Sequence, residues 1–237
     1  MKQPRRTNVA PISSSHRAYE ILRRAFVVCE VAPGSQVTEA SLVERYGLTR
    51  AAVRAALGRL RQQRWIEASP RRGYVVRPLT LKDIRDLFAV RTLLEPAAAE
   101  MAARNATHPE LLRISDLARL ATNHDELGDE AISVFLEANT RFHVAVAGAS
   151  GNTRIAQLLE ELLAEMERML HFGLSSTRRG IEMDQEHGAL VEALLRRDPA
   201  AAADAAREQV VAAEKMVEVV LLRHPNLENV NLAQEGL

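Results

Sequence analysis

Two arginines one helical turn apart, Arg50 and Arg54, follow Thr49 at the start of a run with helical periodicity. The planar fork of an arginine can bond the O6 and N7 atoms of guanine together, or bind a phosphate. The small side chains of Ala51 and Ala52 allow close approach to a DNA groove. The pattern predicts base reading through Thr49, Arg50, Ala52 and Arg54. The alternative is a charged helix that faces solvent.

Two helices joined by a tight turn are expected to position this arginine pair. Apolar periodicity predicts helices over residues 16–30, 38–46 and 50–63. The apolar stripe of the first extends to Cys29. Thr38 and Thr49 stand where N-capping residues stand, and Gly47 stands where a helix commonly ends. The second and third helices then form a helix-turn-helix, whose second helix enters the major groove of DNA.

A β-hairpin is predicted directly after the third helix. Two short β-like runs, 65–67 and 74–77, flank a turn that contains Pro and Gly. Arg71 and Arg72 stand at the tip beside Gly73. The hairpin, or wing, is therefore expected to enter or straddle a minor groove with these three residues.

The charge of the chain is unevenly distributed. The 237 residues have a net charge of zero, but residues 1–79 contain 15 Lys and Arg against 5 Asp and Glu, a net charge of +10. Residues 80–237 carry the compensating −10. A basic first third favours contact of that part with a polyanion. The alternative is that these charges are ordinary solvated surface groups and that their uneven distribution along the chain is accidental.

The remainder of the chain has helical periodicity and no strand pattern. Thr80 and Asp83 have the form of a capping box at the start of the first of six predicted helices. These helices span residues 81–105, 109–123, 129–148, 152–172, 181–197 and 199–223. The predicted fold class is mostly α: a winged helix-turn-helix of three helices and a small β-hairpin wing, followed by an all-α six-helix bundle.

The predicted divisions of the chain follow from these elements. They are a disordered N-terminal segment (1–14), a DNA-binding domain (15–77), a linker (78–80), an effector-binding domain (81–223) and a C-terminal tail (224–237).

Polar side chains recur on the apolar stripes of the later helices. They are Arg91 with Glu95 one turn on, Asn139, His143, His187 and Gln209. An unpaired buried polar group costs free energy, so several that converge on one core indicate a wet cavity with a bound ligand. Arg91 has two interpretations, an ion pair with Glu95 or a bidentate clamp on an effector carboxylate. The spacing leaves both open.

Composition excludes other classes of protein. Apolar residues make up 47% and charged residues 26%, as in globular chains, and no apolar stretch approaches the ~20 residues of a membrane span. Residues 1–15 lack the apolar segment of a signal peptide. The single cysteine, Cys29, cannot form an internal disulfide. We therefore expect a cytoplasmic protein with no membrane contact.

Residues 32–34, 37–42 and 46–57 resemble the DNA-binding domain of the GntR family of bacterial transcription regulators, and residues 66–76 resemble its wing. Ala52, Ala55 and Arg64 stand where this family often has Pro, Glu and Gly. Ala40 stands where some members place a DNA-contacting arginine. The resemblance implies that the third helix docks in the major groove, and these departures leave the operator sequence open.

Residues 80–223 resemble the FCD ligand-binding domain of FadR-type members, through segments 91–95, 139–143, 149–152 and 186–187. Many such domains hold a divalent metal, of Zn or Ni type, at positions that map onto Asn139, His143, His187 and Gln209. Gln209 departs from the histidine of that pattern, and two imidazoles with two neutral amides form a poor cage for such a metal. Three interpretations remain: weak metal binding completed by an effector, direct effector binding by these side chains and Arg91, or satisfied core histidines.

Together these patterns predict a DNA-binding transcriptional regulator that is not an enzyme, acting as a homodimer on a pseudo-palindromic operator. The resemblance implies a repressor whose operator affinity is changed by a small carboxylate, an organic or sugar acid. One alternative is a metal-dependent hydrolase or lyase that uses His143 and His187. It lacks support from a Ser or Cys nucleophile motif or a glycine-rich phosphate loop. Another is an effector-free DNA-binding scaffold.

Overall fold

The computed structural model describes residues 13–121, 129–173 and 180–222. They group into two compact units. One is made of residues 13–26, which lie in or directly before α1 (Ser14–Val27), and of residues 30–78; the other is made of residues 27–29 and the described residues from 79 onward. Several predicted features fall largely or wholly outside the described residues. They are the predicted tail, residues 1–12 of the predicted N-terminal segment, and two predicted helix breaks, near 128 and between 173 and 180.

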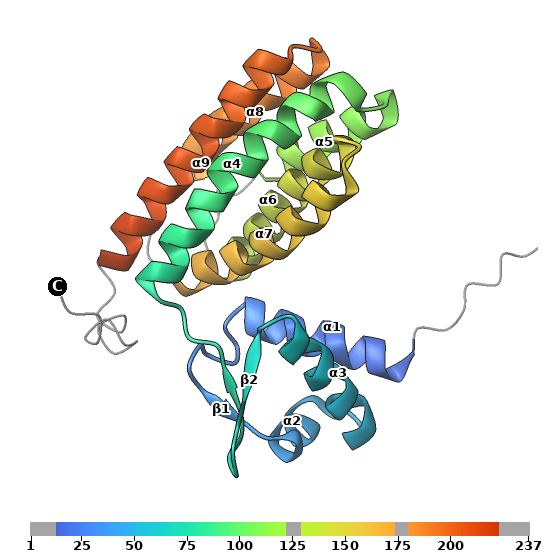
Figure 1. The fold of residues 1–237 in the computed structure, drawn as a ribbon, viewed down its shortest axis with the longest axis vertical. Helices are drawn as coiled ribbons and strands as arrows, with labels where there is room; N and C mark the ends of the chain where they lie inside the picture. Colours follow the sequence, from blue (N-terminus) through green and yellow to red (C-terminus); the bar gives the residue numbers. More distant parts are fainter. Residues whose placement is uncertain (1–12, 122–128, 174–179, 223–237) are drawn as a thin grey trace, which may run out of the picture. The chain divides into compact units, whose positions relative to one another are not determined.

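Three helices and a small sheet make up the described part of the first unit (Figure 1). After α1 come β1 (Gln36–Val37), α2 (Glu39–Tyr46), α3 (Arg50–Gln62), β2 (Ile66–Ser69) and β3 (Gly73–Val76). The antiparallel sheet has the order β1-β3-β2, so the predicted hairpin is present and pairs with an additional strand. Gln36 lies opposite Val75 and Val37 opposite Tyr74. A two-residue strand such as β1 is too short to produce a periodic signal.

Local capping interactions set the direction of the helix-turn-helix. Thr38 accepts a hydrogen bond from the Ser41 N–H at 3.1 Å, and Thr49 accepts one from the Ala52 N–H at 3.3 Å. Gly47 ends α2 in the left-handed conformation, with φ of 61°. These three residues were predicted to have these roles, and the structure confirms them, because each interaction spans at most one helical turn.

The first helix ends earlier than predicted. α1 stops at Val27 rather than at residue 30, and Cys29 lies beyond it with a positive φ of 55°. The chain reverses there, since the Val31 N–H donates to the Ala25 carbonyl at 3.1 Å and Val31 becomes buried. Burial of Val31 depends on tertiary packing, which the periodicity of residues 16–30 does not predict. The ends of strands β2 and β3 differ from those of the predicted runs by at most two residues.

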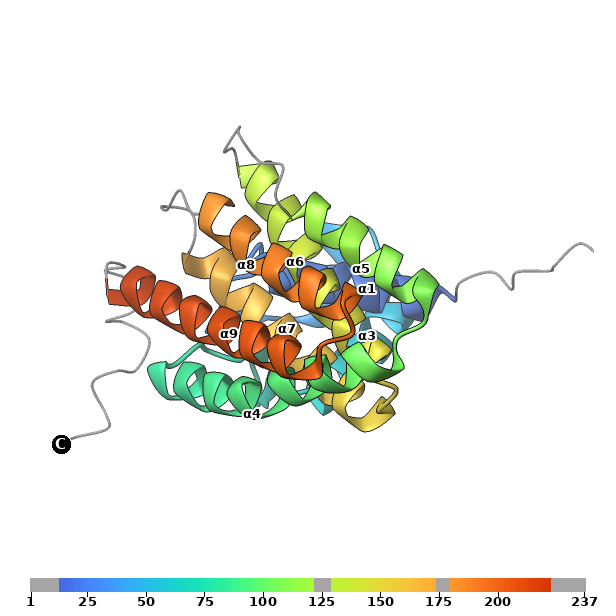
Figure 2. The same cartoon turned by 90° about the horizontal axis from the view of Figure 1, so that it is seen from above.

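Six helices form the described part of the second unit, as predicted. They are α4 (Leu81–Asn105), α5 (His108–Leu120), α6 (Asp129–Ala149), α7 (Thr153–Gly173), α8 (Gly180–Leu195) and α9 (Pro199–Leu222). α4 and α9 lie side by side along most of their length and form the most extensive packed pair (Figures 1 and 2). The Thr80–Asp83 capping box begins α4. Leu79, in the predicted linker, is buried in the bundle core with Ile84 and Phe88.

The fold class predicted from the sequence is therefore confirmed, a winged helix-turn-helix followed by an all-α bundle. Within the described ranges, none of the helices is long and apolar enough to cross a membrane.

Arg64, between α3 and β2, is an exposed residue with a left-handed backbone, φ 62°. This conformation costs a non-glycine residue about 1–2 kcal/mol, against the 0.5–1 kcal/mol of extra chain entropy that a glycine loses on folding. We expect Arg64→Gly to raise the free energy of unfolding by about 0.5–1 kcal/mol, measured by urea denaturation. The control is Arg61→Gly, inside α3, which is expected to lower it by about 1 kcal/mol. Equal losses in both variants would contradict the strain argument.

Candidate nucleic-acid interface and buried polar site

The N-terminal turn of α3 presents two arginine side chains to solvent. Thr49 caps this turn, and the side chains of Arg50 and Arg54 are 69% and 67% exposed. Both leave the same side of the helix because they are four residues apart. Ala51 and Ala55 are exposed beside them. This face therefore combines two guanidinium groups with small neighbours that do not obstruct a groove.

Ala52 does not belong to this face. It is 4% exposed and packs into the core of its unit, next to Val53. Its N–H is already engaged by the Thr49 hydroxyl. Helical phase turns the Ala52 side chain inward while that of Ala51 stays outward, and the DNA contact of Ala52 stays a prediction.

The wing tip carries Arg71 and Arg72, both exposed. Ser69 lies opposite Gly73 in the hairpin, and the Arg72 N–H donates to the Ser69 carbonyl at 3.0 Å. Gly73 has φ of 90°, and a Cβ atom there would lie 2.5 Å from the Val37 carbonyl oxygen. Gly73 thus permits the close approach of the wing to β1, which gives this residue a structural role whether or not it contacts DNA.

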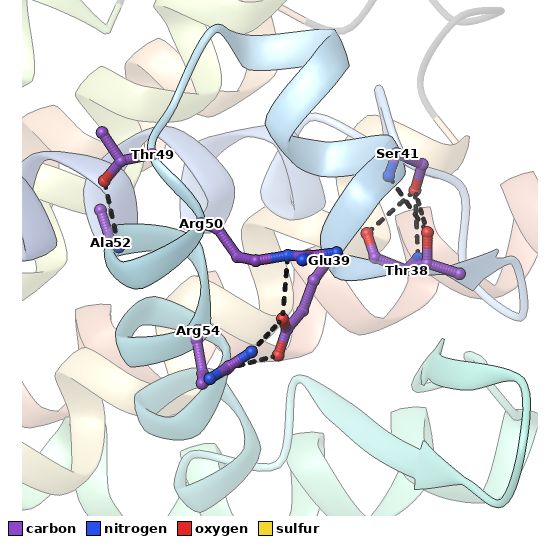
Figure 3. A network of polar contacts seen from close by, with 7 residues as sticks. All are labelled: Thr38, Glu39, Ser41, Thr49, Arg50, Ala52 and Arg54. Carbon is purple, nitrogen blue, oxygen red and sulfur yellow. Dashed lines mark hydrogen bonds and ion pairs between the residues drawn. The ribbon is translucent and has the colours of Figure 1, made fainter.

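A carboxylate that the sequence patterns did not single out lies among these arginines. Glu39, the first residue of α2, accepts two hydrogen bonds from Arg54, from Nε at 3.0 Å and from Nη2 at 2.9 Å (Figure 3). The Nε atom of Arg50 is 3.9 Å from the same carboxylate. The Arg54 hydrogen bonds hold the pKa of Glu39 below its usual value, so Glu39 is charged at neutral pH. Fifteen residues separate the partners, which is why spacing alone did not pair them.

The interior of the bundle collects the other predicted site residues. Arg91, Asn139, His143, His187 and Gln209 are 3%, 7%, 8%, 2% and 4% exposed, and they come from α4, α6, α8 and α9. All five are therefore withdrawn from solvent, as the apolar stripes predicted.

Arg91 and Glu95 form a buried ion pair on α4. The second carboxylate oxygen of Glu95 lies 3.2 Å from Nδ1 of His143 on α6. Burial acts to raise the pKa of Glu95, but the charges of Arg91 and His143 outweigh it and lower that pKa to about 2. The ion-pair interpretation of Arg91 is thus observed. Glu95 also links α4 to α6, a contact that the sequence did not indicate.

His187 lies beside His143 in an apolar setting. The ring centroids of these two histidines are 5.4 Å apart, and the Phe142 ring is 4.4 Å from that of His187. Burial, with a smaller contribution from His143, lowers the pKa of His187 to about 3. His187 is therefore a neutral imidazole over the whole physiological range of pH.

Three buried polar atoms in this group have no hydrogen-bond partner within the described part of the chain. They are Nη1 of Arg91, Oδ1 of Asn139 and Nδ1 of His187. A buried polar atom without a partner costs about 1–3 kcal/mol. A hollow of about 10 Å³, room for about one water molecule, is lined by Glu95 and His143 and by apolar residues of α4, α6, α7, α8 and α9. The unpaired atoms are therefore polar groups that an added hydrogen-bonding partner could satisfy.

The same donors do not fit a tightly held Zn or Ni ion. The four positions supply two imidazoles and two amides, with no carboxylate or thiolate among them. The nearby carboxylate of Glu95 is already held by Arg91 and His143. Among the described residues, no group of three His, Cys, Asp or Glu side chains is arranged to hold a metal. This donor set therefore differs from the His, Cys and carboxylate ligands that zinc and nickel favour.

Comparison with known proteins agrees with the two-unit organisation. Residues 14–76 match the family described as bacterial regulatory proteins, gntR family, and residues 86–212 match the FCD domain. The HTH-type transcriptional regulator BphR of Paraburkholderia xenovorans (strain LB400) is 29% identical over 184 residues, 76% of this chain and 75% of that protein. The HTH-type transcriptional repressor RspR of Escherichia coli (strain K12) is 25% identical over 187 residues, 78% and 80% of the two chains.

Solved structures show the same fold. Escherichia coli McbR/YncC superposes with a TM-score of 0.76 at 20% identity, over 88% of this chain and 98% of that one. A GntR regulator from Rhodococcus sp. RHA1 superposes with a TM-score of 0.73 at 23% identity, over 86% and 97% of the two chains.

The lowered pKa of His187 predicts a loss of stability in mild acid. Below pH 6.5 the unfolded chain takes up a proton at His187, whereas the folded chain does not until about pH 3. The free energy of unfolding should therefore fall by about 2 kcal/mol between pH 7 and pH 5. Glu95 adds nothing in this window, since its stabilising contribution is lost only below its usual pKa of 4.5. Urea denaturation in EDTA at several pH values measures the effect.

The matched control is His187→Leu, which has no proton to take up at this position. Its unfolding free energy should vary by about 2 kcal/mol less than that of the wild type over the same pH range. Parallel curves for the two proteins would contradict a neutral, buried His187.

The metal argument has its own test in Gln209→His, which would supply a third imidazole. We expect this variant to gain a rise in melting temperature on addition of Zn²⁺, because three imidazoles are a typical zinc ligand set. Wild type and Gln209→Leu should respond far less, as measured by thermal unfolding with Zn²⁺ or with EDTA. A wild-type response as large as that of Gln209→His would show that the two amides suffice.

Proposed function

The chain belongs to the GntR family of bacterial transcriptional regulators and carries an FCD domain, and from this membership we propose that it is a repressor released by a small carboxylate. The carboxylate binds inside the helical bundle and lowers the affinity of the protein for its operator. The relative RspR, which carries the name of a transcriptional repressor, supports the sign of this response. The relatives McbR, BphR and RspR are each described as a transcriptional regulator or repressor, and none of the three is described as an enzyme.

The observation that carries the DNA-reading part of the proposal is the exposed pair Arg50 and Arg54 on the capped N-terminal turn of α3. In a helix-turn-helix this turn faces the base edges of the major groove. Arg71 and Arg72 on the wing add contacts to the minor groove or to phosphates. Thr49 and Gly73 hold these two segments in place.

The observation that carries the effector part is a trio of buried atoms, on Arg91, Asn139 and His187, that have no hydrogen-bond partner among the described residues. Arg91 Nη1 is a charged donor, which a carboxylate oxygen satisfies best. Asn139 Oδ1 is an acceptor, and it requires a donor such as a hydroxyl group. A small hydroxy acid or sugar acid supplies both groups, with His143 and Gln209 as further contacts. Metal is not required by this arrangement.

Two copies of the chain read the operator in this proposal, as a homodimer on a pseudo-palindrome. The outer side of α4 supports self-association, since Leu93 is 73% exposed and Val90, three residues before it, is 38% exposed. Effector binding changes operator affinity only to the extent that the effector favours one arrangement of the two copies over another. By linkage, DNA binding changes effector affinity by the same factor as the effector changes DNA affinity.

The DNA-reading part is tested by titrating the wild-type chain with duplexes from its own promoter region and with a scrambled duplex. Affinity should fall steeply with salt, and Arg50→Ala/Arg54→Ala should weaken binding to the preferred duplex by about 100-fold or more, because two bidentate contacts are lost. The control Arg196→Ala/Arg207→Ala removes two exposed arginines from the bundle and should leave affinity unchanged. Normal binding by the first variant would refute this reading.

The effector part uses the same titration with a panel of hydroxy acids and sugar acids. A compound that raises the melting temperature should also release the preferred duplex, with and without EDTA. Arg91→Lys keeps the charge but not the planar fork, so it should bind DNA normally and respond at least tenfold more weakly to that compound. A melting temperature that no acid in the panel changes would favour an effector-free DNA-binding protein.

A further inference from the structure

We propose that Glu39 is a positioning residue that makes Arg54 selective for guanine. Its carboxylate holds one edge of the Arg54 guanidinium so that the other edge faces the DNA groove. The inference depends on the DNA-reading role of Arg54 proposed above. It adds a residue of α2, outside the DNA-reading helix α3, to the residues that determine which operator sequence is bound.

The geometry of the pair leaves Arg54 able to bind a base. Nε and Nη2 donate to the two oxygens of Glu39 at 3.0 and 2.9 Å. A guanidinium has five N–H donors, so two on Nη1 and one on Nη2 stay available. Donors on Nη1 and Nη2 form a second fork, which matches the O6 and N7 acceptors of guanine. Arg54 can therefore hold Glu39 and a guanine at the same time.

Glu39 is well placed to serve as the fixed partner. It is the first residue of α2, and the Thr38–Ser41 capping box holds the backbone on both sides of it (Figure 3). Its side chain is 22% exposed, whereas that of Arg54 is 67% exposed. The more buried and more constrained carboxylate thus restricts the longer, freer arginine. An arginine that is already oriented loses less rotamer freedom when it binds a base.

The charge of Glu39 also acts against contacts without sequence specificity. A carboxylate close to DNA repels phosphates, and the ion pair keeps Arg54 from turning toward them. Arg50 is held more loosely, since its Nε atom is 3.9 Å from the carboxylate and outside hydrogen-bond distance. Glu39 therefore restrains Arg54 in one orientation and leaves Arg50 adaptable.

The test compares two kinds of DNA at physiological salt. Wild-type protein selects duplexes from a random-sequence pool, and the specificity ratio is the affinity for the selected duplex divided by the affinity for a scrambled one. Glu39→Gln should lower this ratio about tenfold, the size of one bidentate base contact, while affinity for the scrambled duplex rises severalfold. The salt dependence of scrambled-duplex binding should steepen by about one counterion, because Arg54 is free to reach a phosphate.

Two further variants separate position from charge. Glu39→Asp keeps the charge but shortens the arm, so it should lower the specificity ratio with little rise in scrambled-duplex affinity. Glu44→Gln removes a charge from an exposed position on the same helix and should leave the ratio unchanged. The melting temperature of each variant shows that it is folded.

A double-variant cycle assigns the effect to Arg54. Arg54→Ala should abolish the preference for guanine at one position of the selected duplex, and Glu39→Gln should add no further loss to it. Suppose that Arg54→Ala alters this preference. If either Glu39→Gln or Glu39→Asp then keeps the wild-type specificity ratio, the positioning role of Glu39 is refuted. If Arg54→Ala leaves the preference unchanged, the DNA-reading role of Arg54 fails and the inference fails with it.

Discussion

A guanidinium inside an apolar helix bundle is the constraint on which the organisation of the second unit depends. Arg91 is 3% exposed, and because an arginine keeps its proton in a protein, its charge has to be balanced where it lies. Glu95, one turn later on α4, balances it and at the same time contacts His143 on α6. Arg91, Glu95 and His143 therefore form a connected polar group that joins α4 to α6.

The same pair of residue types has a different effect in the first unit. Arg54 and Glu39 form two good hydrogen bonds, but the Arg54 side chain is 67% exposed. An ion pair in contact with water contributes little to folding stability, at most about 1 kcal/mol. Its consequence is conformational, since it limits where the guanidinium points. Burial thus distinguishes an ion pair withdrawn from solvent, Arg91 with Glu95, from one whose guanidinium stays exposed, Arg54 with Glu39.

Several features of the fold could be predicted because they depend on neighbours in the chain. The caps Thr38 and Thr49 and the glycine Gly47 each act within about one helical turn, and the structure has them where they were expected. The early end of α1 and the strand β1 could not be predicted, because both depend on packing against distant residues. Ala52 faces the core while its neighbour Ala51 faces solvent, because one residue on a helix is a rotation of about 100°.

The amino-acid sequence by itself determined the order of the helices, the basic wing and recognition helix, and the set of polar residues that lie inside the bundle. Each of these follows from local periodicity, capping and charge. Only the tertiary structure decided which partners these residues have. It placed Glu39 against Arg54 and Glu95 against His143, and it left one buried atom each of Asn139 and His187 without a hydrogen-bond partner in the described part of the chain. The reason is that a partner on another helix is set by how the helices pack, and no spacing along the chain records that distance.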